Sequence, residues 1–148
     1  MDIVVNNKSI KLTNNDFITA GGEGELFGKS NTIFKIYHKP KNSKPKAKIK
    51  ELSQIDRENV ISPKNLIHNP SGDYIGFTMD WKKETYPLCK FITNTFRKKH
   101  NIDIKTITQL VNNIKKSISF VHDEGFLIVD GNEFNYLVDK NDFTKPYF

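Results

Sequence analysis

The chain has 148 residues and a net charge of +6, and its 36% hydrophobic and 27% charged residues are typical of one globular domain, not of a disordered tail. A disulfide scaffold is excluded because Cys89 is the only cysteine, and no apolar run reaches the roughly 20 residues that a membrane span requires. The first residues lack the basic-then-apolar order of a signal peptide, so we expect a cytoplasmic protein with no membrane partner.

The first half of the sequence predicts short β-strands. Residues 3–5 and 10–12 are β-prone segments on either side of Asn6-Asn7-Lys8, a composition that predicts an opening hairpin. A glycine-rich loop at 20–24 separates later apolar segments, whereas residues 63–70 are predicted to form a loop. The further strands are predicted at 17–19, 25–27, 32–37 and 74–79.

The segment from Lys39 to Lys50 carries six lysines and no acidic residue. We favour a solvated loop that runs into a helix at 45–55, where apolar residues recur at helical spacing. The alternative is a surface that binds phosphate backbones or other anions. Because the chain has only two arginines, the bidentate contact to guanine is nearly unavailable, and we expect no sequence-specific binding of nucleic acid.

The second half predicts a long amphipathic helix. Asp103 is a good N-cap and Gly125 a good stop, with apolar residues between them at alternating spacings of three and four. A coiled coil is indicated by a stripe of about three to four heptads. This stripe is shorter, so we favour a core helix. The residues of the stripe are Ile104, Ile107, Val111, Ile114, Ile118 and Val121.

Two features of the first half could bind phosphate. In Gly21-Gly22-Glu23-Gly24, residues without a Cβ allow backbone N–H groups to approach phosphate oxygens, although the run alone is more often a hairpin turn. Lys35 lies within a predicted strand, where alternation puts Phe34 and Ile36 on one face and the lysine on the other. A cation placed there could reach phosphates in a cleft, or it could simply face solvent.

A third feature follows the long helix. Asp130 and Asn135 lie five residues apart in a short loop between two apolar runs. In phosphoryl transfer, an Asp of such a loop accepts the proton of the attacking hydroxyl, and an Asn further along holds a metal ion. The alternative is an Asx-rich turn between strands.

Together these segments resemble a protein kinase-like fold over nearly the whole chain. Residues 18–27 look like the glycine-rich loop, with Gly21 and Gly24 as its second and third glycines and Thr19 in place of the first. Residues 32–35 resemble the strand with the ATP-anchoring lysine, and residues 126–138 resemble the catalytic loop with its flanks. GGEGELF, FKIYHKP and the D-x-N-x-x-N loop are similar to bacterial kinase-like proteins that carry helix-hairpin-helix DNA-binding modules, although this sequence contains no such module.

The resemblance implies an α+β fold and two cofactors, ATP and Mg²⁺. Residues 1–81 would form an N-lobe of five antiparallel strands and one helix, and residues 82–148 a partial, helical C-lobe with its catalytic-type loop at 130–135. Lys35 would bind the α- and β-phosphates, Asp130 would orient the acceptor hydroxyl, and Asn135 would hold Mg²⁺. The residues that would cover the phosphates are Gly21, Gly22 and Gly24.

The resemblance also assigns supporting roles. Glu51, with Glu58 behind it, would supply the carboxylate that pairs with Lys35. Met79 and Trp81 would belong to a hinge that offers backbone hydrogen bonds to adenine, although Trp81 is equally well explained as a core anchor. The usual His-Arg before the catalytic Asp is replaced by Ile128-Val129, so we expect no regulation through a phosphorylated activation loop.

The end of the chain departs from the family pattern. A second metal-binding Asp would be expected beyond Phe148, and we interpret Asp139 and Asp142 as turn residues. The first hypothesis is therefore an ATP-binding, kinase-like phosphotransferase domain, truncated and inactive as this isolated chain. The alternative is a non-catalytic pseudokinase fragment that binds or inhibits a protein partner, and a basic nucleic-acid module is a third.

Overall fold

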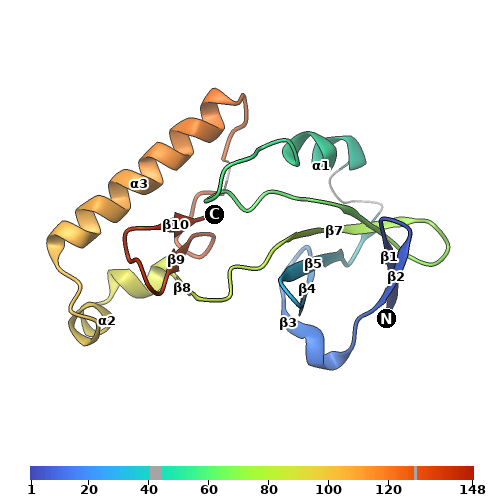
Figure 1. The fold of residues 1–148 in the computed structure, drawn as a ribbon, viewed down its shortest axis with the longest axis horizontal. Coiled ribbons are helices and arrows are strands. Elements are labelled where there is room, and N and C mark those ends of the chain that lie inside the picture. Colours follow the sequence, from blue (N-terminus) through green and yellow to red (C-terminus); the bar gives the residue numbers. More distant parts are fainter. Residues whose placement is uncertain (41–44, 129) are drawn as a thin grey trace. The chain divides into compact units, whose positions relative to one another are not determined.

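The computed structural model describes residues 1–40, 45–128 and 130–148. Lys41 and Lys44 of the lysine-rich segment, and Val129 beside the predicted catalytic loop, lie outside the described residues. The chain forms two compact units, and Figure 1 follows it from one to the other. The first unit comprises residues 1–56 and 62–82, and the second comprises residues 57–61 and 83–148.

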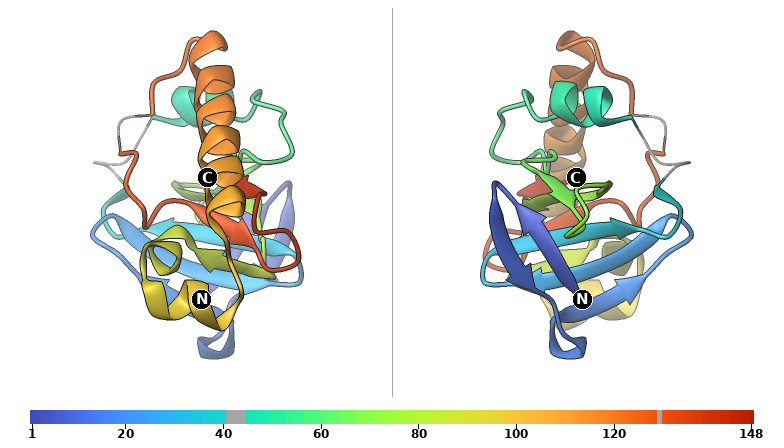
Figure 2. Two further views of the ribbon diagram at one scale, coloured as in Figure 1. Left: turned by 90° about the vertical axis from the view of Figure 1, so that its left-hand side faces the viewer. Right: turned by 90° about the vertical axis from the view of Figure 1, so that its right-hand side faces the viewer.

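The first unit is an antiparallel sheet with one α-helix (Figure 1). Its strand order is β2-β1-β6-β7-β5-β4-β3, and Figure 2 shows a strong twist, with β1 and β2 lying across the direction of β4 and β5. The elements are β1 (Asp2–Val5), β2 (Lys8–Lys11), η1 (Asn14–Asp16), β3 (Phe17–Ala20), β4 (Gly24–Lys29), β5 (Thr32–Tyr37), α1 (Lys46–Leu52), β6 (Leu66–His68) and β7 (Tyr74–Asp80).

The sheet has seven strands in the described part of the chain, so the expected five-stranded sheet is too small. The predicted loop at 63–70 contains β6, which pairs with β1 on one side and β7 on the other. Three residues are too few for alternation to indicate a strand, and the partners of β6 are distant in sequence. The expected opening hairpin is confirmed: Asn6 and Asn7 have φ of 50° and 62°, which suits a tight two-residue turn.

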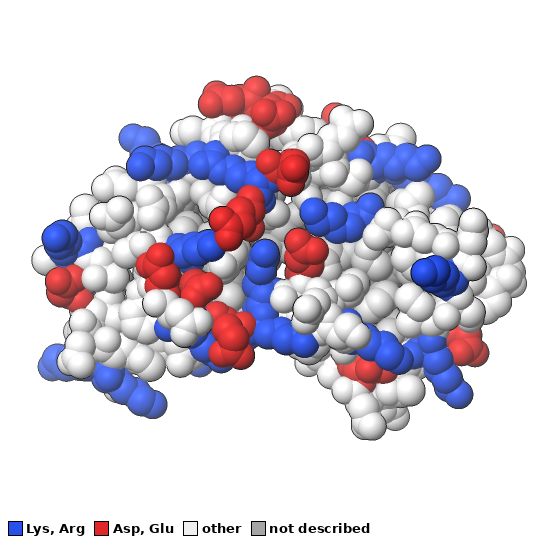
Figure 3. Space-filling view, viewed as in Figure 1, with Lys and Arg blue, Asp and Glu red and all other residues white. Residues whose placement is uncertain are grey.

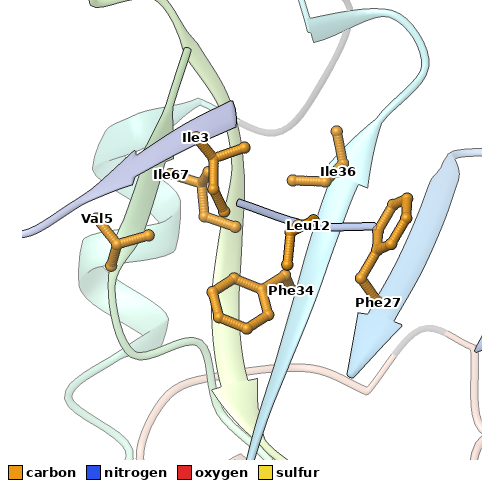
Figure 4. Close-up of a cluster of buried hydrophobic side chains, with 7 residues drawn as sticks. All are labelled: Ile3, Val5, Leu12, Phe27, Phe34, Ile36 and Ile67. Carbon is orange, nitrogen blue, oxygen red and sulfur yellow. The ribbon is translucent and has the colours of Figure 1, made fainter. Parts of the chain in front are cut away.

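Alternation along β5 supplies both faces of the sheet. Phe34 and Ile36 belong to the larger hydrophobic cluster, shown in Figure 4. Tyr37 belongs to a second cluster with Phe77 and Ile49, through which α1 packs on the sheet. The expected separation of Lys35 from Phe34 and Ile36 is confirmed, because the Lys35 Nζ lies 5.7 Å from the ring centre of Tyr37 and 5.9 Å from that of Phe77. The larger cluster consists of Ile3, Val5, Leu12, Phe27, Phe34, Ile36 and Ile67.

The second unit combines helices with a small antiparallel sheet of order β10-β9-β8. Phe91, Leu110 and Val138 form its buried core. No helix in the described ranges has the length and apolarity needed to cross a bilayer. The elements are β8 (Thr85–Pro87), η3 (Leu88–Ile92), α2 (Asn94–Lys99), α3 (Ile104–Asp123), β9 (Leu137–Asp139) and β10 (Pro146–Tyr147).

Helix α3 confirms the predicted helix and its ends. The Asp103 side chain accepts a hydrogen bond from the Thr106 N–H at 2.7 Å, and Gly125 follows the helix with φ of +81°. The predicted apolar stripe is only partly a core face, because Ile104 and Val111 are 76% and 57% exposed. The buried residues of the helix are Leu110, Ser117 and Val121, of which only Val121 belongs to the stripe. Ile107 and Ile114 of the stripe are partly buried and pack on the core cluster that contains Leu110.

Candidate functional site

The glycine-rich loop joins β3 to β4 and is tied to β5. Within the loop, the Gly21 N–H donates to the Gly24 carbonyl at 2.9 Å. The residue after β5 then holds the loop twice: the His38 N–H donates to the Glu23 carbonyl at 3.0 Å, and His38 Nε2 lies 3.0 Å from the Gly21 carbonyl oxygen. The backbone of this loop is therefore fixed by contacts that do not involve the Glu23 carboxylate.

The glycines of this loop have different physical roles. A Cβ on Gly24 would lie 2.1 Å from the carbonyl oxygen of Ile36, so the close approach of β4 to β5 requires glycine there. A Cβ on Gly21 or Gly22 would meet nothing within 4 Å. The space beside these two residues is therefore open to a ligand, as the predicted phosphate role requires.

Lys35 reaches the glycine-rich loop. Its Nζ lies 2.6 Å from Glu23 Oε2, with 25% of the lysine side chain and 64% of the glutamate side chain exposed. The rings of Tyr37 and Phe77 flank the ammonium group. Burial raises the pKa of the Tyr37 hydroxyl, with smaller contributions from Tyr74 and the Glu23 charge, so Tyr37 is a neutral neighbour at physiological pH.

The expected pairing of Lys35 with Glu51 is wrong. Glu51 is exposed on α1 and pairs with Lys48 at 3.1 Å, and Glu58 belongs to the second unit, where it pairs with Lys145 at 2.5 Å. The residue that α1 buries against the sheet is Ile49. Since each helical residue turns by about 100°, Glu51 lies about 200° further round and faces away from Lys35.

Met79 and Trp81 lie at the end of β7, where a hinge was expected. The Trp81 N–H donates to the Asn31 carbonyl at 3.0 Å, so this backbone donor is already used within the first unit. The indole covers Gly28, where a Cβ would lie 2.6 Å from the ring, and Met79 packs on the second cluster. These contacts favour the interpretation of Trp81 as a core anchor.

The described lysines of the basic segment are exposed. They are Lys39, Lys46, Lys48 and Lys50. Figure 3 shows Lys, Arg, Asp and Glu side chains on one side of the protein. Lys48 pairs with Glu51 at 3.1 Å, and the exposure of all four described lysines favours a solvated surface.

The second unit contains the loop predicted for catalysis, and its polar side chains converge on Asp130. Asn135 Nδ2 donates to the Asp130 carbonyl at 2.8 Å and to Asp130 Oδ2 at 2.9 Å. Asn132 Nδ2 donates to Asp130 Oδ1 at 2.6 Å, and Asn132 Oδ1 accepts the Phe134 N–H at 2.9 Å. Both carboxylate oxygens of Asp130 are therefore held by amides, while Asn135 contributes its Nδ2 and keeps Oδ1 for another contact.

Asp139 is the last residue of β9 and Asp142 lies in the turn that follows, so the expectation of two turn residues holds for Asp142 and in part for Asp139. Asp139 Oδ1 accepts the N–H groups of Asn141 and Asp142, and its Oδ2 accepts the Tyr147 hydroxyl at 3.0 Å. Asp142 Oδ1 accepts the N–H and the hydroxyl of Thr144. Burial raises the pKa of Asp139, but the hydrogen bonds to its charged form outweigh burial and hold that pKa below the usual value.

The polar groups near Lys35 and in the Asp130 loop suit a phosphate better than a metal ion. The Glu23 carboxylate beside Lys35 shows that an oxyanion fits at the ammonium group. Among residues 1–40, 45–128 and 130–148, no cluster of three or more His, Cys, Asp or Glu side chains could hold a metal ion. For Mg²⁺, Asn135 offers one neutral amide oxygen, whereas this ion prefers carboxylate and phosphate oxygens.

The structure thus joins the predicted site residues in two groups. The glycine-rich loop meets Lys35 in the first unit, and Asp130 meets Asn135 in the second. Sequence reasoning missed Glu23 as the partner of Lys35, although an acid in a hairpin loop opposite a mid-strand lysine is a visible signal. No protein-family model matches the chain, and a search of curated proteins found no relative.

Proposed function

We propose that this chain is an ATP-binding, protein kinase-like domain of the phosphotransferase type. The observation that carries the proposal is the meeting of Lys35 with an oxyanion at the glycine-rich loop, 2.6 Å from its Nζ. A lysine that holds a carboxylate there can hold a phosphate oxygen, and Gly21 and Gly22 leave open space beside it. ATP would supply the transferable phosphoryl group.

The residues of the first unit would bind and neutralise the phosphates. Lys35 would pair with the α- and β-phosphates, while Gly21 and Gly22 would let the backbone approach them closely. In the second unit, Asp130 would orient an acceptor hydroxyl and receive its proton, and two amides fix the position of its carboxylate. If Mg²⁺ binds with the nucleotide, Asn135 Oδ1 is the atom this loop would offer.

ATP binding to the Lys35→Met variant tests the proposal by isothermal titration calorimetry. Loss of a charge-assisted contact to phosphate should weaken ATP binding by about tenfold or more. Lys8→Met is the matched control, because it removes an exposed lysine from the edge strand β2 and should leave ATP affinity unchanged. Equal ATP affinity for wild type and Lys35→Met would contradict the proposal.

A second candidate is nucleotide binding without transfer, as in a pseudokinase that acts on a protein partner. The observation that favours it is the use of both carboxylate oxygens of Asp139 in hydrogen bonds, which makes that side chain a poor metal ligand; the hydrogen bonds of Asp142 are to its Oδ1. Turnover of radiolabelled ATP separates the two functions. Transfer that is abolished by Asp130→Asn supports the phosphotransferase, whereas ATP binding without Asp130-dependent transfer supports the pseudokinase.

A further inference from the structure

We infer that Glu23 is an internal competitor for Lys35, so that a phosphate-bearing ligand must displace its carboxylate before it can use the lysine. The inference rests on the proposed function, since it assigns a regulating residue to the same nucleotide site. It concerns a residue of the glycine-rich loop that the sequence resemblance gives no role. The occupant that must be displaced is thus part of the chain itself.

The contact is well placed for competition. Glu23 Oε2 lies 2.6 Å from Lys35 Nζ, a distance typical of a charge-assisted hydrogen bond. Tyr37 and Phe77 lie 5.7 and 5.9 Å from the same ammonium group and offer it ring faces, but no anionic partner. The carboxylate therefore holds the position at Lys35 that a phosphate oxygen would take.

Only the side chain of Glu23 needs to move. Its carbonyl accepts the His38 N–H at 3.0 Å, and the Gly21 N–H to Gly24 carbonyl bond closes the loop independently of the carboxylate. The Glu23 side chain is 64% exposed, so a rotation about its own bonds can release Lys35 into solvent or to a ligand. Exchange thus leaves the loop backbone in place.

Competition of this kind selects for the charge of the ligand. A phosphate carries more negative charge than a carboxylate and has three oxygens that can accept hydrogen bonds, so it is the stronger partner for an ammonium group. A ligand without phosphate gains no binding free energy from Lys35, so its binding does not require Glu23 to move. The Glu23 carboxylate should therefore weaken ATP binding but leave adenosine binding unaffected.

The test is a set of ATP titrations by calorimetry on the full chain. Because an exposed ion pair contributes little, Glu23→Gln should tighten ATP binding by about two- to fivefold. Glu25→Gln is the matched control, since it removes the same charge two residues further along, where the β4 backbone lies opposite Ile36. In the Lys35→Met background, Glu23→Gln should gain no more affinity than Glu25→Gln does.

Three results would overturn the inference. Unchanged or weaker ATP binding by Glu23→Gln, with wild type binding ATP through Lys35, would remove the competition and leave the proposed function standing. A gain that persists in Lys35→Met would show a general charge effect. Failure of every variant and of wild type to bind ATP would remove the proposed function, and the inference with it.

Discussion

Lys35 and Asp130 are the two charged residues that the proposed function depends on most, and the protein holds them in different ways. Lys35 is held by another movable charge, the exposed Glu23 carboxylate. Asp130 is held by the neutral amides of Asn132 and Asn135 within six residues of chain. A charge held by a counter-charge can exchange that partner for a ligand, whereas a carboxylate held by amides of its own loop keeps its position.

The largest loss of stability is expected at Gly24, where β4 packs closely against the backbone of β5. Gly24→Ala places a Cβ 2.1 Å from the Ile36 carbonyl oxygen, so β4 and β5 must separate. We expect the free energy of unfolding to fall by about 1–3 kcal/mol or more, measured by urea denaturation. Gly22→Ala, whose Cβ meets nothing within 4 Å, should change it by less than about 0.5 kcal/mol. Equal losses for the two variants would contradict this account.

Removal of an amide should loosen the Asp130 loop. Asn135→Ala deletes two hydrogen bonds to Asp130, so we expect local opening to become easier by about 1–2 kcal/mol. Hydrogen exchange at the backbone N–H of residue 135, which donates to the Asn132 carbonyl, is the measurement. Asn141→Ala is the control, because Asn141 donates to Asp139 through its backbone N–H, which the substitution keeps. Unchanged protection in Asn135→Ala would show that the amide does not hold the loop.

The sequence predicts features that depend on neighbouring residues better than those that depend on distant strands. Short-range features were predictable: the Asn6-Asn7 turn and the Asp103 cap depend on residues within a few positions. For Lys35, the acid in the hairpin loop was a local signal for Glu23, but the β4–β5 register and the rotation of α1, which decide between Glu23 and Glu51, do not follow from the sequence. Strand β6 was missed for the same reason, since only β1 and β7 make residues 66–68 a strand.

A pH experiment extends the comparison to Asp139, whose carboxylate accepts hydrogen bonds from two backbone N–H groups and from the Tyr147 hydroxyl. The pKa of Asp139 is below its usual value, so the folded protein binds fewer protons than the unfolded chain. The contribution of Asp139 to the free energy of unfolding is complete above pH 3.8, its pKa in the unfolded chain. It is lost as the pH falls through the lower pKa of Asp139 in the folded protein. Tyr147→Phe removes one donor to Asp139, so it should lower the free energy of unfolding by about 1 kcal/mol or less at neutral pH.

Urea denaturation in neutral and strongly acidic buffer measures this effect. The difference between wild type and Tyr147→Phe should shrink once Asp139 is protonated. Tyr136→Phe deletes the same atom from another buried tyrosine and should give a difference that does not depend on this carboxylate. A Tyr147→Phe difference that is constant with pH would show that the hydroxyl does not support the charged form.

The smallest effect is expected for the ion pair itself. Glu23→Gln should change the free energy of unfolding by less than about 1 kcal/mol, because an exposed pair gains little over its solvated state. The change should vanish at about 1 M salt, where the Debye length is only about 3 Å. A larger, salt-independent loss in urea denaturation would mean that Glu23 is a structural residue and not an exchangeable partner.

The outermost strand of the first sheet bears on how the protein avoids aggregation. Strand β3 is an edge strand, and Phe17 and Ile18 on it are 46% and 42% exposed. A straight edge of this composition would offer its free N–H and C=O groups to a strand of another molecule. The register with β4 shifts between Phe17 and Thr19, so the backbone bulges at Ile18 and interrupts the row of paired groups. The bulge therefore shortens the stretch on which an intermolecular β-sheet could begin.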